Sequence, residues 1–149
     1  MPEQRDDWFT RLKSIEREYQ SVALALHAYV QTCQTDPTPL AFYNLRPSDL
    51  VLAEQNVEPT YVVRLFALFE SGLRSYWGSL KDTVPPSRDL IDSVASRRNI
   101  PELEAQGVHA VRRYRNSLVH DVDDQFEAVS LATVRKNLSI YLSRLPRNW

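Results

Sequence analysis

The sequence predicts an all-α fold, a bundle of about five helices that forms one domain over residues 1–149. Apolar residues recur at steps of three and four along most of the chain, which is the spacing of a helix face. Only 3 glycines are present, too few for a sheet with many tight turns. The 9 prolines gather between the apolar-periodic segments, where they separate helices instead of breaking them.

The first helix is expected over residues 7–34. Apolar side chains follow one another there in alternating steps of four and three: Trp8, Leu12, Ile15, Tyr19, Val22, Leu26, Tyr29 and Cys33. Such a seam packs against the core of its own bundle, and it can also contribute to a subunit interface. We favour packing against the core of the same bundle over a subunit interface, although so regular a seam suits both roles.

A long irregular connection is expected after this helix. The sequence Asp36-Pro37-Thr38-Pro39 ends the helix, and the connection then runs to Pro59, with room for one short helix over residues 48–55. Pro59 suits the first turn of the next helix, because the N–H that proline lacks has no helical partner there. A wide apolar arc then extends from Val62 to Leu80.

Three further helices are expected in the second half of the chain. They cover residues 87–98, 102–119 and 130–145. Ser87, which follows Pro85-Pro86, is the expected N-cap of the first of these helices. A polar turn is expected over residues 121–124, before the last helix.

The composition limits the classes of function that fit this chain. The net charge is −1, from 18 basic and 19 acidic side chains, so no broad basic surface is expected and any RNA contact is local. The single cysteine, Cys33, excludes an internal disulfide and a cysteine-based zinc site. The 3 histidines lack ligand spacing, and the acidic residues at 121, 123 and 124 lack the glycine and glutamate of a calcium loop, so no metal or cofactor is expected. The charged N-terminus and the short apolar runs predict a cytoplasmic protein without a membrane segment.

The expected helix over residues 102–119 carries the candidate site. On a helical wheel, one apolar arc contains Val108, Val111, Tyr114, Leu118 and Val119. Arg115 falls inside that arc, and its guanidinium cannot shed its charge, so it requires a partner or a wet cleft. A neighbouring polar stripe contains His109, Arg112, Asn116 and His120. Cations, an amide and an imidazole on one face suit a phosphate group.

The stretch Arg115-Asn116-Ser117-Leu118-Val119-His120 resembles the signature of the HEPN superfamily, in which an arginine and a histidine lie about four to six residues apart near the end of a late helix. Asn116 is the polar residue that usually follows the arginine. The order of helices is similar too: a long first helix, a second that holds Phe69-Glu70-Ser71-Gly72-Leu73-Arg74, and a final helix after the motif. The resemblance implies a HEPN-like helical bundle.

The resemblance also implies an activity. The implied activity is that of a metal-independent endoribonuclease that leaves a 2′,3′-cyclic phosphate and a 5′-hydroxyl on RNA. The resemblance implies a homodimer in which two Arg115/His120 pairs face one groove and form a composite active site. For a stand-alone protein of this size it implies a toxin or an antiphage effector, with a separate antitoxin protein as partner.

The residue types suit the steps of such a reaction. His120 can act as a base or an acid near neutral pH. Arg115 can stabilise the phosphate oxygens, and Asn116 can orient the histidine or bind phosphate. One imidazole cannot easily abstract one proton and donate another in a single step, so a second copy is also a chemical expectation. His109 and Arg112 are expected to contact the substrate.

Glu70 and Arg74 are further candidates on the second long helix. They lie one helical turn apart, so the simpler interpretation is an ion pair within the helix. Alternatively, Glu70 receives Arg115 and holds it for the phosphate, a role that acidic residues on an early helix often have in the HEPN superfamily. Arg74 would then be a substrate contact.

Two other interpretations stay open. Arg115 and His120 could be a structural arginine and a helix-end histidine that satisfies carbonyl groups. A non-catalytic HEPN-like interaction module, such as an immunity or accessory subunit that binds protein or nucleotide, fits the near-neutral charge and the apolar seam equally well. Ser117 and Asp121 do not form a hydrolase triad with His120, because no nucleophile-elbow sequence surrounds the serine.

Overall fold

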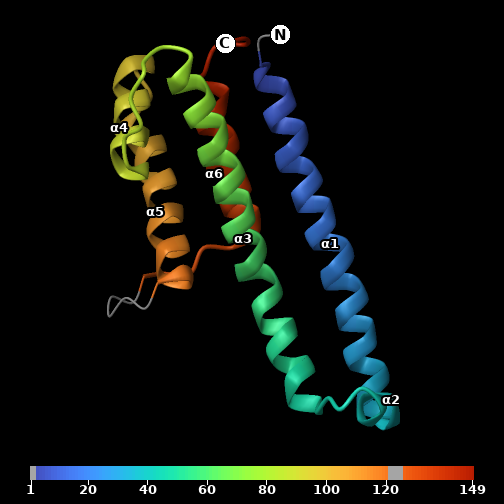
Figure 1. Ribbon diagram of the computed structural model, residues 1–149. Coiled ribbons are helices and arrows are strands. Elements are labelled where there is room, and N and C mark those ends of the chain that lie inside the picture. The colour runs from blue at the N-terminus through green and yellow to red at the C-terminus, as the bar shows by residue number, and fades with distance from the viewer. Residues whose placement is uncertain (1–2, 121–125) are drawn as a thin grey trace.

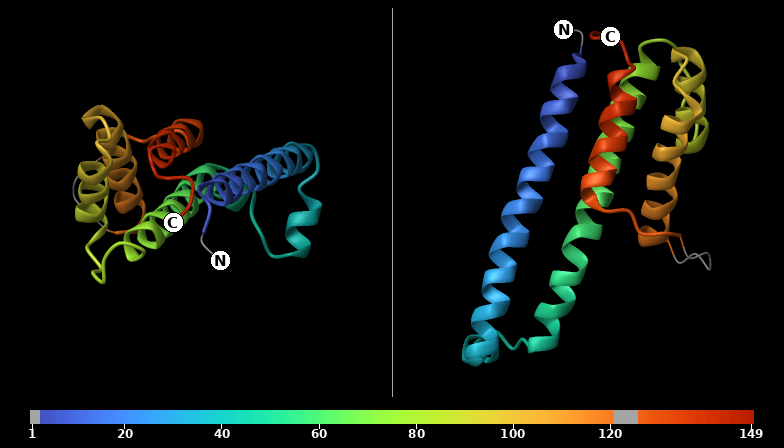
Figure 2. Two further views of the ribbon diagram at one scale, coloured as in Figure 1. Left: turned by 90° about the horizontal axis from the view of Figure 1, so that it is seen from above. Right: turned by 180° about the vertical axis from the view of Figure 1, so that it is seen from behind.

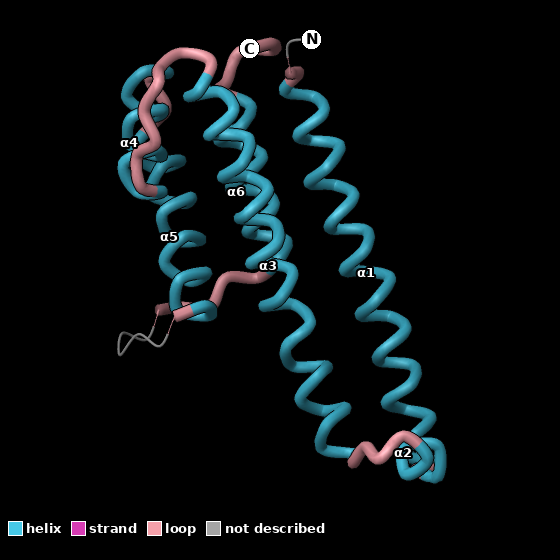
Figure 3. Tube along the Cα trace, in the orientation of Figure 1, coloured by secondary structure: helices cyan, strands magenta, loops and turns pink. Residues whose placement is uncertain are grey.

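The structure, a computed structural model, describes residues 3–120 and 126–149, and within these ranges it contains six helices and no strand. The helices are α1 (Arg5–Thr35), α2 (Thr38–Phe42), α3 (Pro47–Gly78), α4 (Ser87–Arg98), α5 (Glu102–Val119) and α6 (Leu131–Ser143). The predicted all-α bundle is therefore confirmed, with the short α2 as an additional helix (Figures 1 and 3).

The two long helices, α1 and α3, run antiparallel and form a hairpin with α2 at its turn (Figure 1). The three shorter helices α4, α5 and α6 pack around the C-terminal half of α3 (Figure 2). The other half of the hairpin, residues 19–59, projects beyond these helices, and we call it the hairpin extension. Both ends of the chain lie at the opposite end of the bundle, where the backbone N–H of Arg5 donates to the carbonyl of Arg147 at 2.9 Å.

The core lies between the C-terminal half of α3 and the helices around it. Its central side chains are buried Leu65, Phe66, Phe69 and Leu73 of α3, Leu90 and Ile91 of α4, Val108 and Val111 of α5, and Leu138 and Tyr141 of α6. The ring centroid of Phe69 lies 6.0 Å from that of Phe66 and 5.6 Å from that of Tyr141. The Tyr141 hydroxyl donates to the carbonyl of Ile91 at 2.5 Å, so this buried polar group has a partner. Burial raises the pKa of Tyr141, which keeps its hydroxyl protonated as a donor.

The predicted irregular connection up to Pro59 is wrong, and so is the prediction that Pro59 begins a helix. Helix α3 begins at Pro47, includes the residues proposed for a separate short helix, and continues through Pro59. Pro47 takes the first helical position, and the Asp49 carboxylate accepts from the backbone N–H of Arg46 at 2.8 Å. These two residues are the start signal of α3.

An interior proline removes one helical hydrogen bond and costs a helix about 3 kcal/mol. Apolar burial on both sides of Pro59 offsets this cost. Tyr61 and Val62 belong to the main core, and at the tip of the hairpin extension a second cluster joins α1, α2 and α3 through buried Val30, Cys33, Leu40 and Leu50. Tertiary packing therefore decides that α3 is one continuous helix.

The other predicted helices are confirmed, and α1 extends two residues earlier and one residue later than expected. Ser87 is not the N-cap of α4 but its first residue, because Pro86 occupies the cap position without a side-chain hydrogen bond. Ser130 caps α6, where its hydroxyl oxygen accepts from the backbone N–H of Thr133 at 3.2 Å. The polar turn predicted over residues 121–124 lies outside the described residues.

The apolar seam of α1 is only partly buried. Trp8 and Leu12 pack in the main core and Cys33 packs in the second cluster, whereas Val22 and Tyr29 are exposed. The exposed pair lies on the hairpin extension and belongs to neither hydrophobic cluster. The part of the chain that the structure describes has no helix with both the length and the apolar character to cross a membrane.

Candidate functional site

Helix α5 positions the candidate residues. Its buried face consists of Ala105, Val108, Val111 and Tyr114, and it packs against α3, α4 and α6. The apolar arc predicted for this helix is buried only as far as Tyr114, because Leu118 is 39% exposed and Val119 is 48% exposed. Both residues lie in the last turn of α5. The helix thus carries an uncovered apolar end directly before His120.

Arg115 lies half-buried on α5, with its guanidinium over the ring of Phe66 on α3 at 5.8 Å from the ring centroid. Its Nη1 donates to the side-chain oxygen of Asn116 at 3.0 Å. Its Nε is buried and has no hydrogen-bond partner among the described residues. A buried charged donor without an acceptor is costly and rare in folded proteins. Arg115 is therefore held by the ring of Phe66 and the amide of Asn116, while its buried Nε lacks an acceptor among the described residues.

His120 is the residue at which the chain leaves α5. Its backbone is extended, with φ −117° and ψ 144°, and its N–H donates to the carbonyl of Asn116 at 2.9 Å. Its side chain is exposed. Asn116 therefore connects the two predicted catalytic residues, since its side chain contacts Arg115 and its backbone fixes the position of His120.

Glu70 and Arg74 form the ion pair within α3 that the simpler interpretation expected. Glu70 Oε1 accepts from Arg74 Nε at 3.1 Å and from Nη2 at 2.5 Å, and Arg74 Nη1 donates to the carbonyl of Pro85 at 3.0 Å. No hydrogen bond joins Glu70 to Arg115 within residues 3–120. Glu70 lies one turn of α3 beyond Phe66, whose ring contacts the guanidinium of Arg115. The carboxylate of Glu70 pairs with Arg74 instead.

His109 and Arg112 face α4 rather than the end of α5. His109 Nε2 lies 2.7 Å from a carboxylate oxygen of Asp92, and Arg112 Nε donates to His109 Nδ1 at 3.4 Å. The contact from Arg112 assigns the proton of His109 to Nε2, which then donates to Asp92. Burial lowers the pKa of Arg112, and the charges of Arg113 and Arg88 lower it further.

The structure thus divides the predicted polar stripe of α5 into two groups. Asn116 and His120 lie with Arg115 at the C-terminal end of the helix, while His109 pairs with Asp92 of α4 and Arg112 donates to His109. Sequence reasoning missed two participants, Phe66 beneath Arg115 and Asp92 beside His109. No spacing rule indicates either of them, because both contacts join two different helices.

No group of three or more His, Cys, Asp or Glu side chains that could hold a metal ion occurs in the described ranges. The described residues at the end of α5 offer a guanidinium, an amide and an imidazole. Comparison of the chain with family models, with curated proteins and with solved structures finds no match.

Proposed function

We propose that this protein is a metal-independent endoribonuclease that cleaves RNA by attack of a ribose 2′-hydroxyl. The observation that carries the proposal is the arrangement at the end of α5. A half-buried guanidinium with a free buried donor, Arg115, is linked through Asn116 to an exposed imidazole at the helix end, His120. The similarity of these residues to the HEPN signature supports the same activity.

In the proposed reaction, His120 removes the proton of the 2′-hydroxyl, and the 2′-oxygen forms a new bond to phosphorus. The bond from phosphorus to the 5′-oxygen breaks, and that oxygen must gain a proton as it leaves. Arg115 stabilises the negative charge that develops on the non-bridging phosphate oxygens, with a planar fork of donors. The products are a 2′,3′-cyclic phosphate and a 5′-hydroxyl.

A second copy of the chain supplies the second proton transfer. Its His120 would lie on the opposite side of the scissile phosphate, so that one imidazole is the base and the other is the acid. The exposed Leu118 and Val119, next to His120, support an interface at this position because association would bury them. The expected setting is a cytoplasmic toxin or antiphage effector that an antitoxin protein restrains, as the HEPN resemblance implies.

The proposal predicts that Arg115→Lys lowers the rate of RNA cleavage by about 10²-fold, measured in EDTA with purified protein. Lysine keeps the charge but cannot present the planar pair of donors that a phosphate accepts. Arg113→Lys is the matched control, because Arg113 is exposed on the same helix, and this variant should cleave at the wild-type rate. Equal rates for the two variants, or a wild-type protein without activity, would exclude the proposed role.

One observation favours a second candidate, a non-catalytic module that binds another protein. The hairpin extension exposes large apolar side chains, among them Leu24 of α1 at 74% and Phe42 of α2, at the tip, at 84%. Such a surface is typical of protein interfaces. For this candidate Arg115 is structural, so Arg115→Lys should change the melting temperature and no RNA should be cleaved by any variant.

A further inference from the structure

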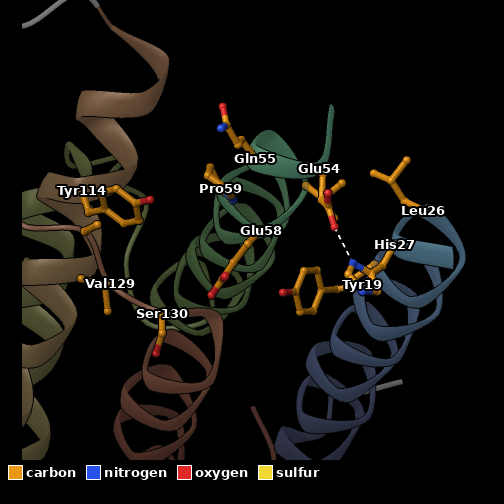
Figure 4. Close-up of a pocket in the computed structure, with 13 residues that line it drawn as sticks. Tyr19, Leu26, His27, Glu54, Gln55, Glu58, Pro59, Tyr114, Val129 and Ser130 are labelled. Atoms are coloured by element: carbon orange, nitrogen blue, oxygen red, sulfur yellow. Dashed lines mark hydrogen bonds and ion pairs between the residues drawn. The ribbon is translucent and has the colours of Figure 1, made fainter. Parts of the chain in front are cut away.

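A cavity of about 580 Å³ lies on the opposite side of Tyr114 from the core, outside the site proposed above. It opens between the hairpin extension, the C-terminal part of α5 and the segment that leads into α6 (Figure 4). Its volume is within the range of sites for small ligands, about 300–1,000 Å³. The residues at its wall with polar side chains are Tyr19, His27, Glu54, Gln55, Glu58, Tyr114 and Ser130.

The charge of this cavity is negative. Glu54 and Glu58 line it, and no lysine or arginine does. Glu54 has a partner, because its Oε1 lies 2.7 Å from Nδ1 of His27. Glu58 is half-buried and forms no ion pair within the described ranges; its Oε1 accepts from the backbone N–H of Leu131 at 2.7 Å, and the hydroxyl of Tyr19 is a further hydrogen-bond partner of this carboxylate. A half-buried carboxylate that lacks a cation attracts one.

Two tyrosine rings flank this carboxylate. Figure 4 shows Glu58 between Tyr19 on one side and Tyr114 on the other. Burial first, and the charge of Glu58 second, raise the pKa of both tyrosines, so both hydroxyls stay protonated and the rings stay neutral. The faces of neutral aromatic rings attract organic cations within about 6 Å.

Pro59 leaves one backbone carbonyl of α3 beside the cavity without its usual helical donor. Because proline has no N–H, it cannot donate the usual helical hydrogen bond to the carbonyl of Gln55, four residues earlier. Gln55 and Pro59 both line the cavity. An ammonium or guanidinium group has several donors, and it would find a carboxylate and a backbone carbonyl within one turn of α3.

We propose that this cavity binds an organic cation, a primary ammonium or a guanidinium group on an alkyl chain. The charged head would pair with Glu58 between Tyr19 and Tyr114, and the chain would lie on the apolar surface of Leu26, Val57 and Val129. The tyrosine rings and the apolar residues of the wall favour an organic cation. Two sources share this chemistry, a free polyamine and a lysine or arginine side chain of a peptide.

The test is a titration of the full chain with butylamine, followed by NMR at the backbone amide of Leu131. This amide donates to Glu58 and therefore reports on the carboxylate directly. We expect a saturable shift with butylamine and none with butanol, which has the same chain without the charge. In Glu58→Gln the side-chain oxygen still accepts from Leu131, but the charge is gone, so affinity for butylamine should fall about tenfold or more.

Two more variants complete this test. Tyr19→Leu should weaken butylamine binding about threefold, because it removes one ring face and leaves the charge of Glu58 unchanged. Glu102→Gln, an exposed residue on α5 that does not line the cavity, should bind like the wild type. Equal shifts with butylamine and butanol, or equal affinity in Glu58→Gln and wild type, would overturn the proposal.

A second pair of titrations, with spermidine and with Nα-acetyl-lysinamide, distinguishes the two sources of the cation. Tighter binding of spermidine assigns the cavity to free polyamines, and tighter binding of the lysine derivative assigns it to peptide side chains. Either order supports a cation site, and the absence of binding by both contradicts it. None of these measurements depends on RNA cleavage, so the cation site and the proposed nuclease succeed or fail separately.

Discussion

Replacing His120 by alanine is expected to lower the rate of RNA cleavage by about 10²- to 10⁴-fold, which is the usual contribution of a catalytic acid or base. The same change should leave the melting temperature unchanged. The His120 side chain is exposed, and it is the backbone of His120, not its ring, that contacts Asn116. Single-turnover cleavage of a labelled RNA and a thermal melt of the same protein preparation measure the two quantities.

His27→Ala is the control for this prediction. His27 is also exposed, but it lies on α1 and its Nδ1 pairs with Glu54, far along the sequence from the end of α5. It should cleave RNA at the wild-type rate. A His120→Ala protein that is folded and as active as the His27→Ala protein would rule out His120 as the acid or base.

Replacing Phe69 by alanine is expected to lower the free energy of unfolding by about 3–5 kcal/mol. Phe69 is fully buried where α3 meets α6, and its ring lies between those of Phe66 and Tyr141. Truncation leaves a cavity that these two aromatic rings cannot fill without leaving their own contacts. Equilibrium unfolding in urea, monitored by circular dichroism, measures the change.

Phe42→Ala is the matched control, since it makes the same truncation at the tip of the hairpin extension. Phe42 is 84% exposed, so its loss should change the free energy of unfolding by no more than about 0.5 kcal/mol. If both variants lost the same stability, the core would not be centred on the C-terminal half of α3. The Phe42 variant would then point to an interface that covers the tip.

The helices that the sequence predicted well are those with strong local signals. Helix α4 follows Pro85-Pro86, α5 follows Ile100-Pro101, and Ser130 caps α6, so each start is visible in a few residues. The start of α3 was missed because Pro59 is also a start signal when it is considered alone. Only the contacts of Leu50 and Tyr61 with other helices show that the helix continues through it.

The candidate site also combines features that local sequence indicates with features that depend on other helices. The proximity of Arg115, Asn116 and His120 follows from helix geometry, because the three residues lie within about one and a half turns. The partner of Arg115 could not be predicted, since Phe66 reaches it from another helix. The exposure of Leu118 also depends on where the neighbouring helices end, and a helical wheel contains no such information.

The most direct test of the proposed function is the chemistry of the cleaved ends. Purified wild-type protein should cleave a defined RNA in EDTA and leave a 2′,3′-cyclic phosphate and a 5′-hydroxyl, which mass spectrometry identifies. The same oligonucleotide with 2′-deoxyribose at the cleavage position should stay intact there, because it has no attacking hydroxyl. Three results would contradict the assignment of Arg115 and His120. They are cleavage at the deoxyribose, products with a 5′-phosphate, and RNA that stays intact after incubation with folded, dimeric wild-type protein.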